Sequence, residues 1–469
     1  MSFKRDLSKE KGLFLIFCFF YNQNMKFSQK KLTFPREYGI IHKVYLPKFT
    51  PKGIYIMKKT TLKNYARLLA ECGVAIQKGD AVIIQASLDQ PEFVAMCVEA
   101  CYKLGAARVM VEWSYQPLQK LHYRYRTLKS LSVVDEIERA KLQYRLDNNP
   151  AMLYLMSDDP DGLKGINQEK MSKASKARFP VIKPFRDAMD NKYKWCIAAV
   201  PGEAWAKKVF PGVRTSTAVE DLWSAILFTS RVIDKDGNDL DPVAQWKAHN
   251  ESFRNRCEYL NSLRIKTLEY KSANGTDFTV DMIPEGIFCG GSENTLGGEE
   301  FNPNIPSEEI FTSPKAGCAE GLVVASLPLS YRGELIENFS VRFEGGRVVE
   351  VKAEKGEDLL RQMVSMDNGA AMLGECALVP YTSPIRESGI TFYETLFDEN
   401  AACHLALGRG FTNCIKDYDQ YSLEELHAMG INESMIHVDF MIGTEDLSII
   451  AVTESGERVA IFADGNWAF

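Results

Sequence analysis

The sequence has few histidines and lacks the short motifs of the commonest nucleotide-binding and hydrolytic proteins. Only 6 of its 469 residues are histidine. Neither GxGxxG nor GxxxxGKS/T occurs, so nothing indicates a bound nucleotide. GxSxG and HExxH are absent as well, which gives a serine hydrolase weak support and a single-zinc protease of the HExxH type none.

Cationic surface, paired cysteines and long apolar runs are also missing. The formal net charge of -6 offers no broad basic face for nucleic acid. No CxxC pair occurs among the eleven cysteines, so they resemble buried thiols of a reducing compartment rather than a disulfide framework. The apolar run Leu13–Tyr21 is too short to span a bilayer, and no other candidate exists. We therefore expect a cytoplasmic protein without a nucleic-acid or membrane partner.

Residues 1–56 differ in composition from the rest of the chain, being rich in Lys, Phe and Tyr. Basic residues precede the apolar run, as in a signal peptide, but no small-residue cleavage site follows it. An amphipathic helical pattern then begins after Met57. We expect the folded protein to begin at Met57, and residues 1–56 to be a disordered extension or the product of an upstream start codon.

The first half of the chain has the pattern of a parallel α/β layer. A length of 469 residues favours two or three domains. Apolar spacing predicts a helix over 62–72, and then a strand–helix–strand unit over 81–86, 91–104 and 107–113. The run 195–200 predicts another strand of the same sheet. We assign residues 57–246 to an N-terminal α/β domain.

The second half changes to alternating strands. A long helix over 242–263 marks the boundary, which we place near Lys247. Alternating segments joined by turn residues then predict hairpins over 265–282, 341–351 and 449–462, with helical spacing at 359–364 and 423–429. We assign residues 247–469 to a C-terminal α+β domain with a mainly antiparallel sheet.

His437 and Asp439 lie two residues apart in the apolar run 435–442. In a strand both side chains leave on the same face. A neighbouring imidazole nitrogen and carboxylate oxygen are ready ligands for a divalent cation. A core histidine beside a capping aspartate explains the isolated pair equally well.

Three more segments place carboxylates or an imidazole in apolar surroundings. Glu309 precedes Ile and Phe and should open a strand, although Glu308 and Glu309 are also read as a solvated pair. Glu375 stands between a glycine and four apolar residues, where a charge is costly unless it is paired or bound to metal. In the third segment Asp398 is read alternatively as a helix N-cap, and His404 as a core histidine.

Taken together, the four segments favour one shared site. Three or more carboxylates with two histidines would hold two divalent ions about 3.5–4 Å apart. Oxygen and nitrogen ligands favour Zn, Co, Mn or Mg over a thiolate site. A carboxylate that can reach both ions should be the most damaging to lose, and Glu375 and Asp439 are the candidates.

The segments 304–312, 373–375, 396–408 and 437–443 resemble the thermophilic metallo-aminopeptidase family, which includes aminopeptidase T, aminopeptidase S and PepS. The resemblance runs in order from Met57 to the C-terminus. It implies an N-terminal α/β domain, a C-terminal metal-binding catalytic domain and a homodimer that removes the first residue of peptides with a free N-terminus. By motif position it implies two metal ions held by Glu309, Glu375, Glu399, His404, His437 and Asp439, with Glu375 also catalytic.

Phe411 departs from the family, because some relatives carry a tyrosine near the metals at this position. Phenylalanine has no hydroxyl to polarise a carbonyl or contact a metal. Two alternatives therefore remain beside an aminopeptidase. One is another two-metal hydrolase, such as an amidase or phosphoesterase, and the other is a non-catalytic metal-binding protein.

Overall fold

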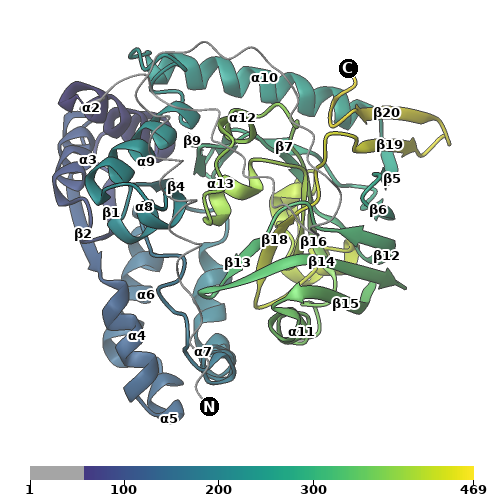
Figure 1. Cartoon of the computed structure of the whole chain (residues 1–469), viewed down its shortest axis with the longest axis horizontal. Coiled ribbons are helices and arrows are strands. Elements are labelled where there is room, and N and C mark those ends of the chain that lie inside the picture. The colour runs from purple at the N-terminus through teal and green to yellow at the C-terminus, as the bar shows by residue number, and fades with distance from the viewer. Residues whose placement is uncertain (1–57) are drawn as a thin grey trace, which may run out of the picture. The chain divides into compact units, whose positions relative to one another are not determined.

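The computed structural model of the chain describes residues 58–469. The expectations for residues 1–56, and for a folded chain that begins at Met57, lie outside the described residues. Within 58–469, helices and strands alternate in the first half, and strands predominate in the second (Figure 1). The fold class expected from the sequence is confirmed. No helix of this part of the chain has the length and apolar character needed to cross a bilayer.

A five-stranded parallel sheet forms the core of the first half. Its strands, in the spatial order β10-β4-β3-β1-β2, all run in the same direction. Near-continuous apolar runs such as Val82-Ile83-Ile84 suit a sheet covered on both faces. The strands are β1 (Ala81–Ser87), β2 (Arg108–Ser114), β3 (Ala151–Met156), β4 (Trp195–Ala199) and β10 (Asn304–Ile305).

Helices surround this sheet, and the two that the sequence predicts are present. Pro91 occupies the first turn of α3, and Gly105 follows its end with positive φ. The predicted helix over 62–72 is α2 continued by one π-helical turn. The helices are α2 (Lys59–Leu68), α3 (Pro91–Lys103), α4 (Gln116–Tyr125), α5 (Leu128–Leu131), α6 (Glu136–Asn148), α7 (Gln168–Met189), α8 (Glu203–Val209) and α9 (Thr215–Thr229).

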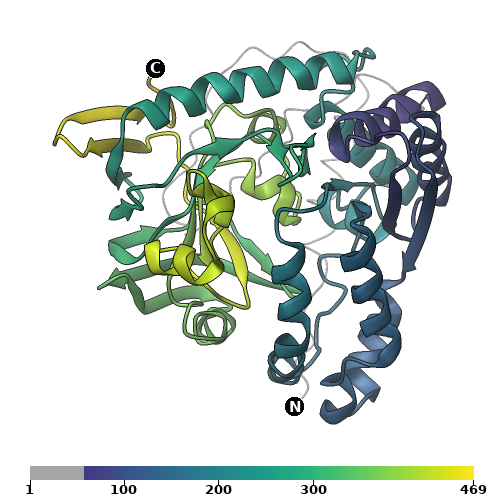
Figure 2. The same ribbon diagram turned by 180° about the vertical axis from the view of Figure 1, so that it is seen from behind.

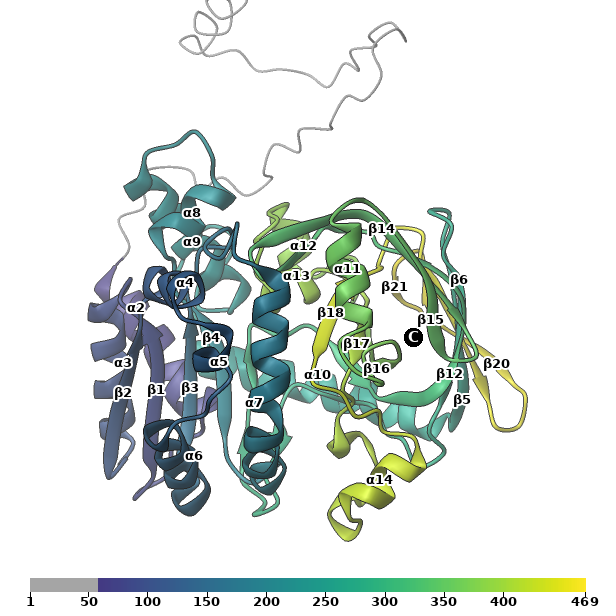
Figure 3. The same ribbon diagram turned by 90° about the horizontal axis from the view of Figure 1, so that it is seen from below.

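Helices α7 and α10 (Pro242–Ser262) connect the two halves. Helix α10 extends along both halves (Figure 2). Its Trp246 packs in the core of the first half, whereas Phe253 and Leu260 pack in that of the second. On α7, Arg186 forms an ion pair with Glu433, and the helix lies beside the second half (Figure 3). The boundary between the predicted domains, 57–246 and 247–469, falls inside α10, and the division into these domains stays a prediction.

The largest sheet of the second half is antiparallel and contains the three predicted hairpins. Its order is β13-β14-β12-β6-β5-β19-β20-β21, with β15 paired to β14. The predicted helices at 359–364 and 423–429 are also present, as α11 (Glu357–Val364) and α14 (Leu423–Met429). The strands are β5 (Ile265–Lys271), β6 (Asp277–Met282), β12 (Pro314–Val324), β13 (Leu329–Tyr331), β14 (Glu334–Glu344), β15 (Arg347–Lys355), β19 (Ser448–Thr453), β20 (Arg458–Ala463) and β21 (Asn466–Trp467).

A second, smaller antiparallel sheet holds the four segments that the sequence singled out. Its strands are β18 (His437–Met441), β17 (His404–Gly408), β16 (Leu373–Leu378), β11 (Ile310–Thr312) and β7 (Cys289–Gly290), in that spatial order. Beside it lie α12 (Pro384–Ser388), α13 (Thr395–Glu399) and the short hairpin of β8 (Glu293–Asn294) and β9 (Glu300–Phe301). We call this sheet the site sheet.

Candidate metal centre

The strand register brings the candidate ligands to one face of the site sheet. Glu375 lies opposite Ala406, which in turn lies opposite Asp439 on the next strand. His404 precedes Ala406 by two residues, and His437 precedes Asp439 by two. Side chains at this spacing share a face, and directly opposed residues do too. The same-face prediction for His437 and Asp439 is confirmed.

The other face of the site sheet is apolar and packs into the core. Leu405, Leu407, Val438 and Phe440 alternate with the polar residues and belong to the main cluster of the second half. This alternation fixes the register, because a shift of one residue would turn the polar side chains into the apolar core and the leucines toward the polar face.

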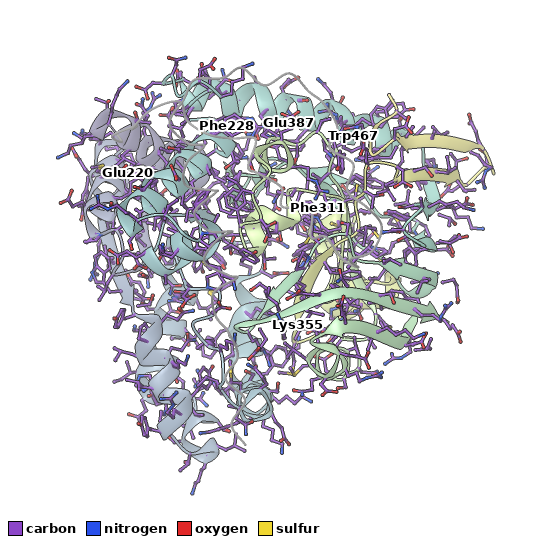
Figure 4. The ribbon with its side chains drawn as sticks, viewed as in Figure 1. Glu220, Phe228, Phe311, Lys355, Glu387 and Trp467 are labelled. Atoms are coloured by element: carbon purple, nitrogen blue, oxygen red, sulfur yellow. The ribbon has the colours of Figure 1, made fainter. Side chains whose placement is uncertain are left out.

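Small side chains leave room on the polar face. Ala377 lies opposite His404 on one side and opposite Phe311 on the other. Glu309, two residues before Phe311, precedes the first residue of β11, as predicted. Phe311 is labelled in Figure 4, where it lies over the strands of this sheet. Alanines 377 and 406 therefore form a floor above which longer acidic and imidazole side chains can meet.

Each histidine contacts at least one carboxylate through its Nε2 atom. His404 Nε2 is 3.1 Å from Glu309 Oε2. His437 Nε2 is 3.1 Å from both Glu375 Oε2 and Asp439 Oδ1. Ligand atoms of Glu309, Glu375 and His404 lie within 4.8 Å of one another, and so do those of Glu375, His437 and Asp439. Glu375 belongs to both groups.

Backbone carbonyls fix the orientation of both imidazoles. Nδ1 of His404 is 2.9 Å from the carbonyl oxygen of Glu399, and Nδ1 of His437 is 2.7 Å from that of Arg409. A carbonyl only accepts, so Nδ1 carries the proton and donates in each case. The Nε2 lone pairs then face the carboxylates. Metal-binding histidines commonly have this arrangement, with the second nitrogen held by an outer partner.

A β-bulge sets the position of Glu375. The pairing of β16 with β17 shifts between Leu373 and Glu375, so Gly374 is the additional residue. A Cβ atom at Gly374 would lie 2.2 Å from the carbonyl oxygen of Arg409. Only glycine allows this approach. The Gly-Glu pair seen in the sequence thus has a geometric cause.

Glu399 reaches the cluster from α13 rather than from the sheet. It is buried, and its charge is close enough to Asp439, Glu309 and Glu375 to raise its pKa. Asp398 does not cap the helix, because α13 already begins at Thr395, so that alternative reading is wrong. Its carboxylate instead accepts the N–H groups of Phe392 and Glu394.

Burial and mutual repulsion shift the pKa values of the cluster. Desolvation, opposed by His437, raises the pKa of Glu375 to about 7, and burial raises that of Glu399 well above its usual range. Although burial opposes it, contact with Glu309 raises the pKa of His404 to about 9. The pKa of His437 is raised by Asp439 and Glu375. His437 in turn holds the pKa of Asp439 below its ordinary value against the effect of burial.

These residues fit a site for divalent cations. An Nε2 lone pair and an ionised carboxylate both offer electrons, so a proton or a metal ion must lie between them. Asp439 Oδ1 is buried and shares the single Nε2 atom of His437 with Glu375 Oε2, at 3.1 Å from each. Carboxylate oxygens and imidazole nitrogens gathered in this way suit Zn, Mn, Co or Mg. The individual ligand assignments remain predictions.

Glu308 points away from the cluster. Its carboxylate forms an ion pair with Arg231 at 2.6 Å and lies 3.8 Å from His249 Nε2. The reading of Glu308 and Glu309 as a solvated pair is therefore wrong, since both are buried and have different partners. His427 also lies outside the cluster and contacts Glu433 at 3.3 Å.

The candidate site opens into a cavity of about 500 Å³. All six predicted ligands line it. The first half of the chain contributes much of the apolar wall, including Ile182, Tyr193 and Trp195. Phe411 also lines it, with its ring centroid 4.7 Å from that of His437. The cavity thus combines a polar sheet face with an apolar wall.

Sequence reasoning missed several charged residues of this cavity. Glu293 and Asp190 both line it. Asp190 forms an ion pair with Arg409 at 2.9 Å and accepts a hydrogen bond from Thr412, so it holds the segment that follows β17. Neither acid stands in an apolar run, which is the signal that revealed Glu375.

Comparison with known proteins agrees with the resemblance of the motifs. The family described as thermophilic metalloprotease (M29) matches residues 58–467. Aminopeptidase AmpS of Bacillus subtilis is 40% identical over 409 residues, which cover 87% of this chain and 98% of the relative. Aminopeptidase T of Thermus thermophilus is 36% identical over 410 residues, with the same coverage. The solved structure of wild-type AmpT from Thermus thermophilus has a TM-score of 0.78 at 35% identity, covering 88% of this chain and 100% of that one.

Proposed function

The chain belongs to the thermophilic metalloprotease (M29) family, and from this premise we propose that it is an aminopeptidase that uses two divalent metal ions. Relatives named as aminopeptidases at 35–40% identity support the activity. The observation that carries the proposal is the position of Glu375. Its carboxylate belongs to both groups of candidate ligands, as expected of a residue that bridges two ions.

The proposed ligands form two groups around this carboxylate. Glu309 and His404 would hold one ion with Glu375, and His437 and Asp439 would hold the other with it. Glu399, on α13, lines the same cavity but belongs to neither group. Bound divalent ions would supply a water of lowered pKa and a Lewis acid for the scissile carbonyl.

Hydrogen bonds orient the two imidazoles of the site, and burial affects the protonation of Glu375. The carbonyls of Glu399 and Arg409 hold the two imidazoles with Nε2 toward the carboxylates. Glu375, which we propose as catalytic, has a pKa raised to about 7 by burial in the metal-free protein, and bound cations would favour its ionised form. The apolar wall with Ile182 and Trp195 excludes water from one side of the substrate.

We propose peptides with a free N-terminus as the substrates. Acidic side chains predominate among the charged residues of the cavity, with Arg186 and Arg409 as its two arginines. Both arginines are already paired, with Glu433 and Asp190 respectively. A phosphate would therefore find no unpaired arginine in the cavity, whereas an α-ammonium would find Glu293 and Glu394, which the proposed ligand set does not include.

A substrate panel tests this function. The full-length protein, loaded with Zn or Co, should hydrolyse leucyl-p-nitroanilide, lose the activity in EDTA and regain it when metal returns. N-acetyl-leucyl-p-nitroanilide should not be cleaved. Activity that is indifferent to the chelator would overturn the proposal. Cleavage of bis-p-nitrophenyl phosphate instead would favour a phosphoesterase, and metal binding without any turnover would favour a non-catalytic protein.

We also propose a homodimer, which the family resemblance implies. Exposed large apolar side chains concentrate between residues 113 and 137, on β2, α4, α5 and α6. Tyr125 is 76% exposed and Ile137 is 72% exposed, and neither α4 nor α6 has a buried residue. Surfaces of this kind are typical of interfaces. Sedimentation should give a dimer that Tyr125→Glu with Ile137→Glu dissociates, whereas Val349→Glu, at an equally apolar exposed position elsewhere, should leave it intact.

A cytoplasmic location is the last of these proposals. Ten cysteines occur in the described residues, and none of them forms a disulfide. Thiols are kept in this state by a reducing compartment. Thiol labelling in freshly lysed cells should modify cysteines without prior reduction, and cell fractionation should recover the protein with cytoplasmic markers; an enzyme recovered outside the cell would contradict the proposal.

A further inference from the structure

Glu293 is an acidic side chain of the cavity that the proposed metal ligands do not include. It lies on β8, in the short hairpin with β9, outside the site sheet. It lines the cavity of about 500 Å³ together with Glu309 and Glu375. It also lines a second cavity of about 440 Å³, and Asn413 is the other residue common to both. Glu293 therefore stands where the two cavities meet.

The carboxylate of Glu293 lacks a cationic or hydrogen-bonding partner. Asp190, another acid of the cavity wall, is held by Arg409. For Glu293, no hydrogen bond or ion pair of its side chain is found within residues 58–469. Burial, with the charges of Glu309, Asp190 and Glu375, raises its pKa to about 7. Glu293 is half-buried, and a carboxylate that is partly removed from water without a partner is stabilised by a cation.

We propose that the Glu293 carboxylate accepts the α-ammonium group of the peptide substrate and so confines cleavage to the first residue. The inference rests on the proposed aminopeptidase function and assigns the residue that selects the free N-terminus. An ammonium carries three donors and one positive charge, which match a carboxylate without donors of its own. An acetylated amine has lost the charge and is larger.

The position of Glu293 suits this role because the amine and the scissile carbonyl are close in the substrate. Two bonds separate the α-nitrogen from the carbonyl carbon of the first residue, a distance of roughly 2.5 Å. An ammonium anchor must therefore lie beside the metal ligands. Glu293 meets this requirement, since it lines the same cavity as the proposed ligands and follows by three residues Gly290, which pairs with Ile310 next to Glu309. The second cavity, which adjoins the first at Glu293, offers further space for the substrate.

The experiment measures how much the substrate amine contributes to binding with and without Glu293. Leucine amide and its desamino analogue, 4-methylpentanamide, are compared as inhibitors of leucyl-p-nitroanilide hydrolysis by the metal-loaded enzyme. In the natural protein leucine amide should bind more tightly than 4-methylpentanamide. The ratio of the two inhibition constants is the amine advantage. In Glu293→Gln this advantage should fall by about 10- to 100-fold, while the desamino analogue binds equally well. KM for the substrate should rise with a much smaller change in kcat.

Two further variants separate the role of Glu293 from general effects. Asp419→Asn removes a charge from the wall of the second cavity alone and should leave the amine advantage unchanged. Glu293→Asp keeps the charge on a shorter side chain and should give an intermediate advantage. An unchanged advantage in Glu293→Gln, with normal metal content, would overturn the inference. Failure of the natural protein to hydrolyse any free-amine peptide would instead overturn the proposed function.

Discussion

His437 Nε2 lies 3.1 Å from Glu375 Oε2, although the two residues belong to strands that are not neighbours in the site sheet. Strand β17 separates them, and its residue between Glu375 and Asp439 is Ala406. The contact is possible because this intervening side chain is a single methyl group. The candidate centre is thus built from long polar side chains that meet above a small one.

Replacement of Glu375 by glutamine should abolish most of the activity. The amide keeps the shape of the side chain but removes a charge shared by both ligand groups. We expect kcat to fall by about 10²–10⁴-fold, and bound metal to fall with it. Mass spectrometry of the metal content and leucyl-p-nitroanilide turnover measure the two effects. Glu424→Gln, on the exposed first turn of α14, is the matched control and should change neither. A Glu375→Gln enzyme with full activity would remove this residue from the mechanism.

Stability of the metal-free protein should fall as pH rises from about 5 to 9. The raised pKa values of Glu375, about 7, and of His404, about 9, mean that the fold retains protons which the unfolded chain releases. These contributions are complete below the unfolded values and are lost as pH passes through the folded ones. The lowered pKa of Asp439 acts in the opposite direction, but only in acid below its ordinary value of 3.8.

Calorimetry of EDTA-treated and Zn-loaded protein at several pH values measures this effect. Metal ions replace the protons, so the Tm difference between the two forms should grow with pH. In Glu375→Gln the fall of the metal-free Tm near neutral pH should be smaller. A metal-free Tm that rises over the same range would contradict the assigned pKa shifts.

Local patterns in the sequence were sufficient to single out segments of the site sheet and several of its candidate ligands. Alternation placed His437 and Asp439 on one face, and the charge of Glu375 stood out because apolar residues surround it. Each of these signals lies within a few consecutive residues. The hairpins were predictable for the same reason, since a turn residue and period-two alternation are local.

Features that depend on distant segments were not predictable. The two-residue strand β10 joins the parallel sheet from the second half of the chain. The residues Asn304-Ile305 contain no pattern that predicts pairing with β4. Helices α4 and α6 have no buried residues, so neither presents the core-facing apolar stripe by which a helix is usually predicted. The proposed role of Glu293 in binding the substrate amine depends on the cavity into which the hairpin places this residue.

Introducing a tyrosine at position 411 should increase the activity. The Phe411 ring contacts the His437 ring, with centroids 4.7 Å apart, and also packs on Phe311. Phe411→Tyr would add a hydroxyl donor on the wall of the cavity, where a developing oxyanion needs one. We expect kcat to rise by about tenfold with an unchanged metal content. Phe311→Tyr, which alters the neighbouring ring, is the control. An unchanged kcat in Phe411→Tyr would show that the reaction in this chain does not use such a hydroxyl.

Enlarging the floor residue Ala406 should destroy the metal centre while the protein still folds. Ala406→Val adds two methyl groups between Glu375 and Asp439, on the face where the long side chains meet. Overpacking of this kind costs about 1–3 kcal/mol of stability, so the fold should survive. Leu405→Val, one residue earlier, changes the opposite face and should cost a similar amount, about 1 kcal/mol. Equilibrium unfolding and metal titration should therefore show two variants of comparable stability, of which only Ala406→Val has lost metal affinity and activity. Equal losses in both would mean that the centre responds to the general stability of the sheet rather than to the space above Ala406.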